Sequence, residues 1–384
     1  MRSLLAAILL LLLAACGEPP LPPPAELGKL VVATREGPNT YQVDGTGKAG
    51  GFEHDLMALF AQELGLEARF ILAHDDADIA AIVEKGRAHL AAANLSPSDH
   101  PALRFSRPIG GARQIPAPLD AVLPFDEAGD LDGRTVVATA WAFPANGDAA
   151  LMQRADAFLE RIRSDGTLDR LIDRYFGHVH RLGAGDVERF LERMHSVLPH
   201  YRRLFIDAQE INGIDWRLLA ALAYQESHWD PLATSRTNVR GMMMLTEDTA
   251  DRLRVSDRLD ARQSILAGAR YLAELREQVP PEAPEPDRTW LAVAAYNLGM
   301  GHLNGARFIA SLVKRDPNSW YEMKEVLPLL AKPEYFARLK SGAARGGEAV
   351  IMTENIRTYF DILRRYEKPA VNPQARSMSS KPPM

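Results

Sequence analysis

The sequence predicts a multidomain chain in which an α/β domain precedes a mainly α-helical domain. The chain has 384 residues, more than one hydrophobic core usually organises. Between residues 30 and 93, short apolar runs alternate with amphipathic segments of helical period, which is typical of a sheet with parallel strands. From residue 214 to residue 366 the helical period is nearly uninterrupted. These observations predict one domain of each class.

Residues 1–15 have the pattern of a bacterial signal peptide. A basic start, Met1-Arg2, precedes an apolar run over residues 4–15, and about twelve residues are too few to span a bilayer as a helix. Cys16, the chain's single cysteine, follows Leu13-Ala14-Ala15 and resembles the lipidated cysteine of a lipobox. That resemblance implies cleavage before Cys16 and its acylation. The alternative is an incidental buried cysteine.

Residues 16–28 are expected to be a tether that begins with the lipidated cysteine. The run from Gly17 to Gly28 reads GEPPLPPPAELG, and its proline density favours an extended chain of roughly 35 Å, at about 3.1 Å per residue. By resemblance to lipoprotein sorting in Gram-negative bacteria, a glycine in place of aspartate after the cysteine implies the outer membrane. We therefore expect a lipid-anchored protein on the outer membrane that faces the periplasm.

Residues 29–178 are predicted to form the α/β domain. Strands are expected at residues 30–34, 68–72 and 89–93, and helices at residues 51–64 and 79–85. This order resembles the first lobe of the periplasmic solute-binding proteins of family 3, which include amino-acid-binding members. Residues 131–138 resemble the start of their second lobe, and residues 155–177 resemble their terminal helices.

The second lobe of this domain is expected to be truncated. After Ala138 the chain reaches the closing segment, residues 140–143, almost at once. A truncated lobe leaves half of a site that is normally built between two lobes. Amino-acid-binding relatives also place an arginine shortly before Phe105-Ser106, whereas here Arg104 directly adjoins Phe105. We therefore expect a non-catalytic scaffold or partner-docking domain, with amino-acid binding as the less favoured alternative.

Residues 179–213 are expected to be a helical connector, and residues 214–367 a helical domain. Helical spacing covers residues 187–211, where Pro199 is expected to break the helix. Further helices are expected at residues 264–275, 289–298 and 351–365. The tail, residues 368–384, is rich in proline, serine and lysine and is expected to be disordered.

Glu226 is the candidate catalytic residue of the helical domain. It ends an apolar helical segment that Asp215 is placed to cap, and it shares one helical face with Leu219, Leu222 and Ala223. A carboxyl group among apolar neighbours loses solvation of its charged form, so its pKa rises. A raised pKa suits a general acid near neutral pH. The alternative is a helix-end glutamate with a surface partner.

Three ordered motifs resemble those of the soluble lytic transglycosylase family. They are Glu226-Ser227-His228-Trp229-Asp230-Pro231 with Gly241-Met242-Met243, then Ala295-Tyr296-Asn297-Leu298-Gly299-Met300-Gly301-His302, then Glu354-Asn355-Ile356-Arg357-Thr358-Tyr359. The resemblance implies a lysozyme-like fold, Glu226 as the catalytic residue and a further set of substrate-binding residues. That set is Ser235, Met243, Tyr296, Asn297, Glu354 and Tyr359. Many relatives carry glutamine where Met244 stands here, so one sugar hydrogen bond is in doubt.

With a lipoprotein leader and a solute-binding-like region in front, the layout resembles membrane-bound lytic transglycosylase F. The resemblance implies cleavage of the β-1,4 bond between N-acetylmuramic acid and N-acetylglucosamine, with a 1,6-anhydromuramoyl product. Ordinary glycosidases need two carboxylates, and the first motif supplies Glu226 with Asp230, which we interpret as structural. The alternatives are a hydrolytic muramidase and a non-catalytic periplasmic sensor or cell-wall-binding lipoprotein.

The composition disfavours several other functions. With 46% hydrophobic and 25% charged residues and a net charge of −5, the chain has no basic stripe for nucleic acid. Its ten histidines show no paired metal spacing, and we expect neither a metal nor a cofactor. The glycine-rich residues 45–51 fit a hairpin turn better than a phosphate cradle. The expected partners are peptidoglycan strands and, through the lipid anchor, the outer membrane; cell-wall enzyme partners stay open.

Overall fold

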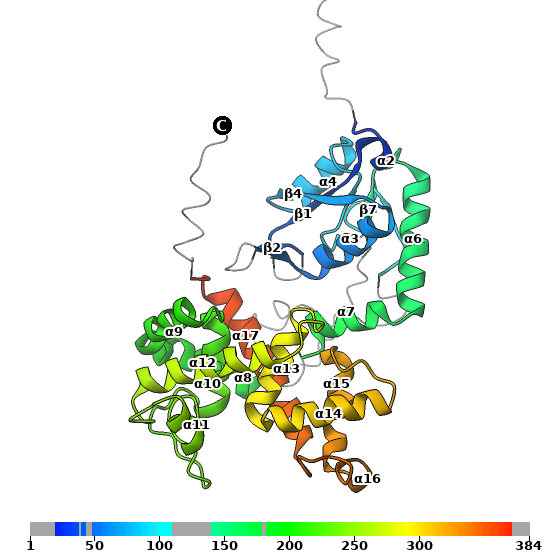
Figure 1. The fold of residues 1–384 in the computed structure, drawn as a ribbon. Helices are drawn as coiled ribbons and strands as arrows, with labels where there is room; N and C mark the ends of the chain where they lie inside the picture. The colour runs from blue at the N-terminus through cyan, green and yellow to red at the C-terminus, as the bar shows by residue number, and fades with distance from the viewer. Residues whose placement is uncertain are drawn as a thin grey trace, which may run out of the picture. The chain divides into compact units, whose positions relative to one another are not determined.

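The computed structural model describes residues 20–37, 40–43, 48–95, 97–109, 140–178 and 182–370. These residues form two compact units, an α/β unit whose last part ends at Tyr175 and a helical unit that runs from Phe176 onward (Figure 1). Both predicted fold classes are confirmed. The predicted signal peptide, Cys16 and the predicted start of the second lobe lie outside the described residues.

The α/β unit is built on a five-stranded sheet of order β4-β1-β5-β7-β6. Its strands are β1 (Lys29–Arg35), β4 (Glu67–Ala73), β5 (Leu90–Ala91), β6 (Arg104–Phe105) and β7 (Ala142–Phe143). Strand β1 pairs in parallel with β4 and β5, at the three positions where the sequence predicts strands. Strand β7 runs antiparallel to both β5 and β6, so the closing segment joins the same sheet.

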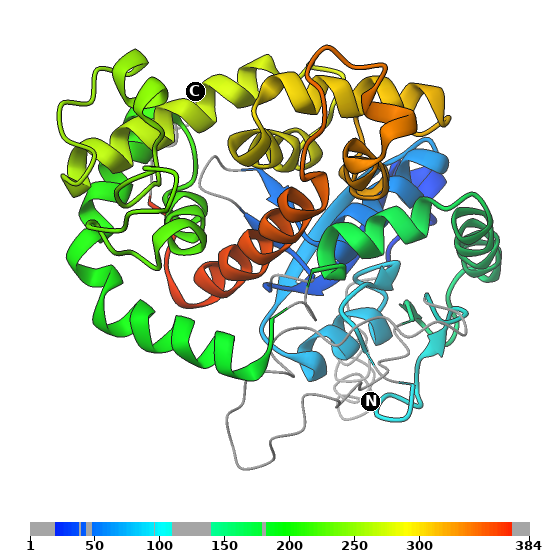
Figure 2. The same cartoon turned by 90° about the horizontal axis from the view of Figure 1, so that it is seen from below.

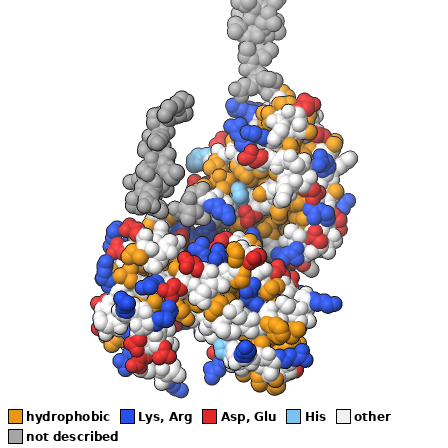
Figure 3. Space-filling view, in the orientation of Figure 1, with side chains coloured by type: hydrophobic (Ala, Val, Ile, Leu, Met, Phe, Trp, Pro, Cys, Tyr) orange, Lys and Arg blue, Asp and Glu red, His pale blue; other side chains and the backbone are white. Residues whose placement is uncertain are grey.

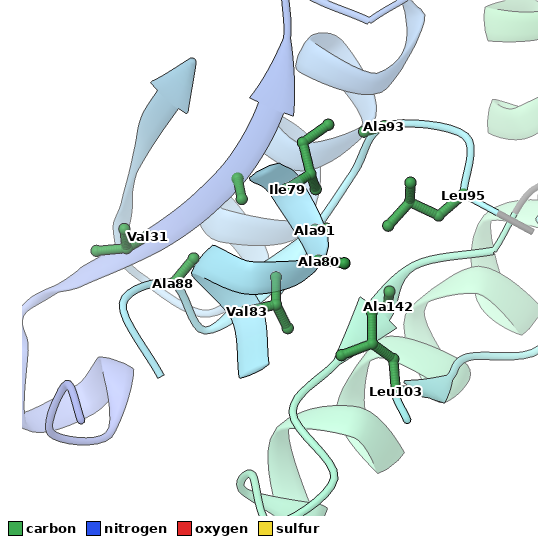
Figure 4. Packing of buried hydrophobic residues seen from close by; sticks show 11 residues of the cluster. Val31, Ile79, Ala80, Val83, Ala88, Ala91, Ala93, Leu95, Leu103 and Ala142 are labelled. Atoms are coloured by element: carbon green, nitrogen blue, oxygen red, sulfur yellow. The ribbon is translucent and has the colours of Figure 1, made fainter. Parts of the chain in front are cut away.

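Two helices, α3 (Phe52–Glu63) and α4 (Asp76–Glu84), contact the strands. The chain continues after β7 into α6 (Ala149–Ser164) and α7 (Thr167–Phe176). Figure 4 shows Ile79 and Val83 of α4 in one buried cluster with Val31, Ala91 and Ala142 of the sheet. Strands β2 (Gln42–Val43) and β3 (Ala49–Gly50) pair in antiparallel fashion, and residues 44–47, where the sequence predicts the turn, lie outside the described residues.

The predicted tether is only partly extended. Residues Pro24–Leu27 form the short helix α2. The Leu21 N–H donates to the Gly86 carbonyl at 2.8 Å, and His89 Nε2 lies 2.9 Å from the Pro22 carbonyl oxygen. The expectation of a free tether up to residue 28 is therefore corrected, because these residues satisfy their backbone groups on the folded unit.

The helical unit contains a series of helices around α17 (Gly346–Tyr366). The preceding elements are α8 (Ala184–Ser196), α9 (Leu198–Asn212), α10 (Trp216–Ser227), α11 (Glu247–Arg252), α12 (Ala261–Gln278), α13 (Asp287–Leu298), α14 (Met300–Leu312), α15 (Trp320–Val326), the 3₁₀ helix η1 (Leu327–Ala331) and α16 (Pro333–Phe336). Helix α17 contacts α10, α13 and η1, and Figure 2 shows it among the other helices. None of the described helices is both long and apolar enough to cross a membrane.

Two boundaries of this unit differ from the sequence prediction. The helix breaks at Val197, with Pro199 in the first turn of α9, as predicted. However, α9 packs against α10 and α12, so it belongs to the helical unit and is not a connector before it. The predicted tail also begins later, because Trp216 Nε1 donates to the Lys368 carbonyl and Gln209 Nε2 donates to the Ala370 carbonyl, both at 3.3 Å. Residues 371–384 lie outside the described part of the chain.

Candidate active site

Glu226 lies in the last turn of α10, a helix that is buried along most of its length. The Asp215 side chain caps the helix by accepting from the Arg217 N–H at 2.9 Å, as predicted. The residues from Trp216 to Tyr224 are buried, whereas Glu226 is partly exposed at the helix end. Burial among these neighbours raises the pKa of Glu226 to about 8, which confirms the direction expected from the sequence.

The chain turns sharply directly after Glu226. His228 and Trp229 both have a left-handed backbone, with φ of 52° and 60°. Non-glycine residues adopt this conformation at a cost, so the surrounding contacts must hold it. One of these contacts is the Trp229 indole, which folds back so that Nε1 donates to the Ala220 carbonyl at 2.8 Å. The turn therefore fixes how α10 ends and where its last side chains lie.

A loop from the same motif is fastened beside this turn. Ser227 Oγ donates to the Met242 carbonyl at 2.8 Å, and the Met243 N–H donates to Ser264 Oγ at 3.1 Å. Gly241 has φ of 86°, and a Cβ there would lie 1.8 Å from the Arg258 carbonyl oxygen. Glycine is therefore required at this position by both conformation and space.

Tyr296 joins the second motif to the first. Its hydroxyl donates to the Met243 carbonyl at 2.8 Å. Burial and the nearby charge of Glu226 raise the pKa of Tyr296 well above its ordinary range, so the hydroxyl keeps its proton. The structure thus brings Tyr296 and Glu226, two of the predicted site residues, into one electrostatic environment.

Two other predicted substrate-binding residues, Asn297 and Ser235, are at least partly accessible to solvent. Asn297 is exposed at the residue after Tyr296. Ser235 is partly exposed, and its Oγ accepts from the N–H groups of Val239 at 3.1 Å and Thr237 at 3.3 Å. The Ser235 hydroxyl therefore shapes the loop in addition to any contact with a sugar.

The predicted substrate contact of the Met243 side chain is corrected by the structure. Met243 is 0% exposed, and a Cβ on Gly268 of α12 would meet its side chain at 2.7 Å. The side chain is therefore packed in the interior. What Met243 contributes to the site is its backbone, which is held by Ser264 and Tyr296.

The predicted direct substrate contact of Glu354 is also corrected. Glu354 is 2% exposed, and its Oε1 accepts from Trp320 Nε1 and from Arg357 Nη1, both at 2.7 Å. Lys324 Nζ lies 3.5 Å from Oε2. Burial alone would raise the pKa of Glu354, but Arg357 and Lys324 outweigh it and hold the pKa below its usual value. A carboxylate enclosed in this way is not accessible to a sugar in this structure.

Tyr359 is the third correction. It is 6% exposed and lies in a group of rings that we call the aromatic cluster: Phe190, Tyr224, Trp229 and Tyr359. The Tyr359 ring stacks on Phe190 with centroids 4.6 Å apart and meets the Tyr224 ring at 4.8 Å. Sequence reasoning did not place Phe190 at the site, because it lies in the segment predicted to be a connector.

The surface of the helical unit is hollowed at its lower edge in Figure 3, between the part that carries α11 and the part that carries α14 and α16. Across the described residues, no group of three or more acidic, histidine or cysteine side chains is arranged to hold a metal ion. Glu226 combines partial exposure with a pKa of about 8, which are the two properties that a general acid needs near neutral pH.

Two family models match the chain in succession. Bacterial extracellular solute-binding proteins, family 3, match residues 30–178, and the transglycosylase SLT domain matches residues 203–311. These ranges fall on the α/β unit and on the helical unit, respectively. A solved ancestral cationic amino acid solute binding protein aligns with 40% of this chain and 97% of its own, at 18% identity and a TM-score of 0.30.

Curated relatives match nearly the whole chain, and each carries the name membrane-bound lytic murein transglycosylase F. The protein of Methylobacillus flagellatus is 42% identical over 96% of this chain and 95% of its own. Those of Thiobacillus denitrificans and Nitrosospira multiformis are 40% and 39% identical, over 94% and 89% of this chain and 92% and 87% of their own. The first alignment has 448 positions, against 384 residues in this chain, so that relative has segments that this chain lacks.

Proposed function

Since the chain belongs to the membrane-bound lytic murein transglycosylase F family and is a peptidoglycan lytic transglycosylase, we propose that Glu226 is its catalytic acid and base. The observation that carries the proposal is a partly exposed carboxyl group, with a pKa of about 8, at the end of a buried helix and beside Tyr296. Such a group is protonated at neutral pH and can still reach solvent or substrate.

In the proposed reaction Glu226 first acts as an acid. It donates its proton to the oxygen of the β-1,4 bond between N-acetylmuramic acid and N-acetylglucosamine, and the bond to the muramoyl C1 breaks. The N-acetyl group of the substrate stabilises the positive centre at C1. The carboxylate of Glu226 then takes the proton of the muramoyl 6-hydroxyl, whose oxygen bonds to C1. The proton returns to Glu226, an anhydro ring forms, and no water is consumed.

The contacts of Glu354 and Asp230, the other two carboxylates of the motifs, support this route over hydrolysis. An ordinary glycosidase needs a second carboxylate as base or nucleophile. Glu354 is buried between Arg357 and Lys324. Asp230 Oδ1 accepts from the Leu232 N–H at 2.9 Å, within the turn after α10. With both engaged in the fold, the muramoyl 6-hydroxyl is the nucleophile that we propose, held close enough to lower the barrier.

We assign supporting roles to three further residues of the predicted site. Tyr296 positions the loop around Met243 relative to Glu226 through its hydrogen bond. Asn297, which is exposed, and Ser235, which is partly exposed, are the residues that we propose contact the sugars. Met243, Glu354 and Tyr359 act only through the framework described above.

The decisive experiment compares the products of wild type and Glu226→Gln on purified peptidoglycan by mass spectrometry. Wild type should release anhydro-muropeptides, and Glu226→Gln should lose at least roughly 10²–10⁴-fold in rate, because glutamine delivers no proton. Glu277→Gln, an exposed substitution on α12, is the matched control and should keep wild-type activity. Reducing-end products from wild type would contradict the lyase reaction. Near-full activity of Glu226→Gln would contradict the assignment of the acid.

We propose further that this membrane-associated periplasmic enzyme is held at the outer membrane by a lipid on Cys16. The support is the leader pattern of residues 1–15 and the membrane-bound relatives. Cys16→Ser should abolish acylation and move the protein from the outer-membrane fraction to the soluble periplasmic fraction. Retention of this variant with the outer membrane would contradict the anchor.

We also propose that the α/β unit is non-catalytic and does not bind free amino acids. All residues assigned to the reaction lie in the helical unit, and the alignment with a longer relative is consistent with a truncated second lobe. The leaderless protein should show no thermal shift with free amino acids. A shift that disappears on deletion of residues 29–178 would contradict this proposal.

A further inference from the structure

Helix α8 (Ala184–Ser196) lies between the two family matches, which end at residue 178 and begin again at residue 203. Neither match therefore assigns it a role. In the structure, however, α8 reaches the turn that follows Glu226 in two ways, by a hydrogen bond and by a ring contact.

The hydrogen bond comes from Arg193. Its Nε donates to the carbonyl of His228 at 2.9 Å. His228 is the residue where α10 ends, and both it and Trp229 have a left-handed backbone. Because non-glycine residues leave this conformation readily unless contacts hold it, a charged donor on the His228 carbonyl fixes the turn.

The ring contact comes from Phe190, one turn before Arg193 on the same helix. Phe190 is fully buried, and its ring centroid lies 4.6 Å from that of Tyr224 and 5.5 Å from that of Trp229. Tyr224 precedes Glu226 by two residues and Trp229 follows it by three. Phe190 therefore packs against Tyr224 of α10, before Glu226 in the sequence, and against Trp229 of the turn that follows Glu226.

We infer that α8 is a positioning element of the active site, in which Arg193 and Phe190 hold the end of α10 so that Glu226 stays in its apolar surroundings. The inference rests on the proposed role of Glu226. Arg193 and Phe190 do not touch substrate in this proposal. They act through the turn, and without them the last turn of α10 loosens and admits water to the carboxyl group.

The charges near this turn show how Arg193 acts. On α8 they are Asp186, Arg189, Glu192 and Arg193; from α10 the titratable groups are Tyr224 and His228, from α17 Tyr359, and from α13 Tyr296. Burial, and then Arg193 and Arg189, lower the pKa of His228, so its ring is neutral at neutral pH. Arg193 therefore meets no cationic ring at His228, and it holds the backbone there by its hydrogen bond to the carbonyl.

The test uses Arg193→Gln, with anhydro-muropeptide release measured as a function of pH on soluble peptidoglycan fragments. The rate falls at high pH when Glu226 loses its proton. If the substitution admits water to the Glu226 carboxyl group, the pKa of Glu226 falls. The basic limb of the profile, which is the fall in rate at high pH, should then shift by about one pH unit or more toward acid. The maximal rate should fall about tenfold with little change in KM, because the substrate contacts are intact.

The matched control is Arg288→Gln on α13. Arg288 is also half-buried, and its Nε also donates to a main-chain carbonyl, that of Arg276 at 3.0 Å. The control should keep both the maximal rate and the basic limb of wild type. Phe190→Leu, which keeps an apolar side chain but removes the ring, is the second probe and should shift the limb in the same direction.

A double substitution separates positioning from general loss of stability. Glycine adopts the left-handed conformation without strain, so His228→Gly makes the turn less dependent on Arg193. Arg193→Gln should therefore cost less activity in the His228→Gly background than in wild type. Equal costs in both backgrounds, or an unshifted basic limb in Arg193→Gln and Phe190→Leu, would overturn the inference. Glu226→Gln in the same assay tests the proposed function separately, since activity there would remove the premise itself.

Discussion

The hydroxyl of Tyr296 donates a 2.8 Å hydrogen bond to the main-chain carbonyl of Met243, 53 residues earlier in the chain. This bond joins α13 to the loop that follows α10. It connects the first two motifs: the second supplies the donor, and the first supplies the main-chain carbonyl. The loop beside Glu226 is thus fixed from a distant helix.

Tyr296→Phe tests this bond. The variant keeps the ring but leaves the Met243 carbonyl without its donor, which should cost about 1 kcal/mol of unfolding free energy. The rate of anhydro-muropeptide release should fall about tenfold, because the loop is no longer held against Glu226. Tyr201→Phe on α9 is the control and should leave the rate unchanged. Denaturant unfolding and product release measure the two effects, and a fully active Tyr296→Phe enzyme would contradict the positioning role.

The stability of the protein should depend on pH through Glu226. Its folded pKa of about 8 lies above the ordinary value of 4.5, so the folded state keeps a proton that the unfolded state releases. The stability associated with this proton is complete below about pH 4.5 and is lost as pH rises toward 8. Glu226→Gln should therefore become progressively more stable than wild type between pH 5 and pH 8. Melting curves across this range measure the difference, and a constant difference would speak against a buried acid.

Glu354→Gln should destabilise the protein, in contrast to Glu226→Gln, and should leave the reaction type unchanged. Glutamine removes the charge that pairs with Arg357 and Lys324 at a buried position, which should cost about 3–5 kcal/mol of unfolding free energy. Where the variant is still folded, at low temperature, its product should remain anhydro-muropeptide, because Glu354 transfers no proton. Chemical unfolding measures the loss of stability, and mass spectrometry of the products shows whether the reaction is unchanged. Full stability with complete loss of activity would show that Glu354 takes part in the reaction.

Gly241→Ala should disrupt the loop after α10. A Cβ at this position would lie 1.8 Å from the Arg258 carbonyl oxygen, and the backbone has φ of 86°. We expect a loss of at least about 2 kcal/mol together with a large fall in activity. Gly347→Ala is the control: a Cβ at this position on α17 would meet no atom within 4 Å, so the change should be neutral or slightly stabilising. An unaltered melting temperature for Gly241→Ala would contradict this geometry.

Glu53 should make the α/β unit sensitive to pH. It is buried on α3, and Trp141 Nε1 donates to its Oε2 at 3.1 Å. Burial raises the pKa of Glu53 to about 7, although the bond from Trp141 lowers it. Stability of this unit should therefore fall as pH rises from about 4.5 to 7, and Glu53→Gln should remove this fall. Tryptophan fluorescence during unfolding reports the effect, with exposed Glu84→Gln on α4 as the control, which should keep the wild-type dependence.

The sequence predicted the structure best where the residues that determine a helix or strand lie within that helix or strand or directly beside it. Helix α10 is an example, because the apolar spacing before Glu226 and the cap at Asp215 are both local. The parallel pairing of β1 with β4 and β5 also follows from local alternation of strands and helices. These features required no knowledge of distant contacts.

The sequence predicted poorly where burial comes from distant partners. Glu354 and Tyr359 lie on a helix that other helices contact on more than one side, and helical spacing does not show which face is covered. Their partners, Trp320 and Phe190, are far away in the chain. The prediction of a free tether was wrong for a related reason. Leu21 and Pro22 form hydrogen bonds with Gly86 and His89, and proline content does not reveal such distant partners.

The backbone hydrogen bonds of the C-terminal segment set the limits of any shortened version of the enzyme. The carbonyls of Lys368 and Ala370 are bound by Trp216 and Gln209, so a gene truncated before residue 370 removes acceptors from the helix that carries Glu226 and from its neighbour α9. At the other end, a fragment begun at the family match, residue 203, would cut α9 in its first half and discard α8. The helical unit itself begins at Phe176, and Thr358 Oγ1 of α17 donates to the His178 carbonyl at 2.9 Å. A recombinant catalytic fragment for crystallisation or inhibitor screening should therefore extend from Phe176 to at least Ala370.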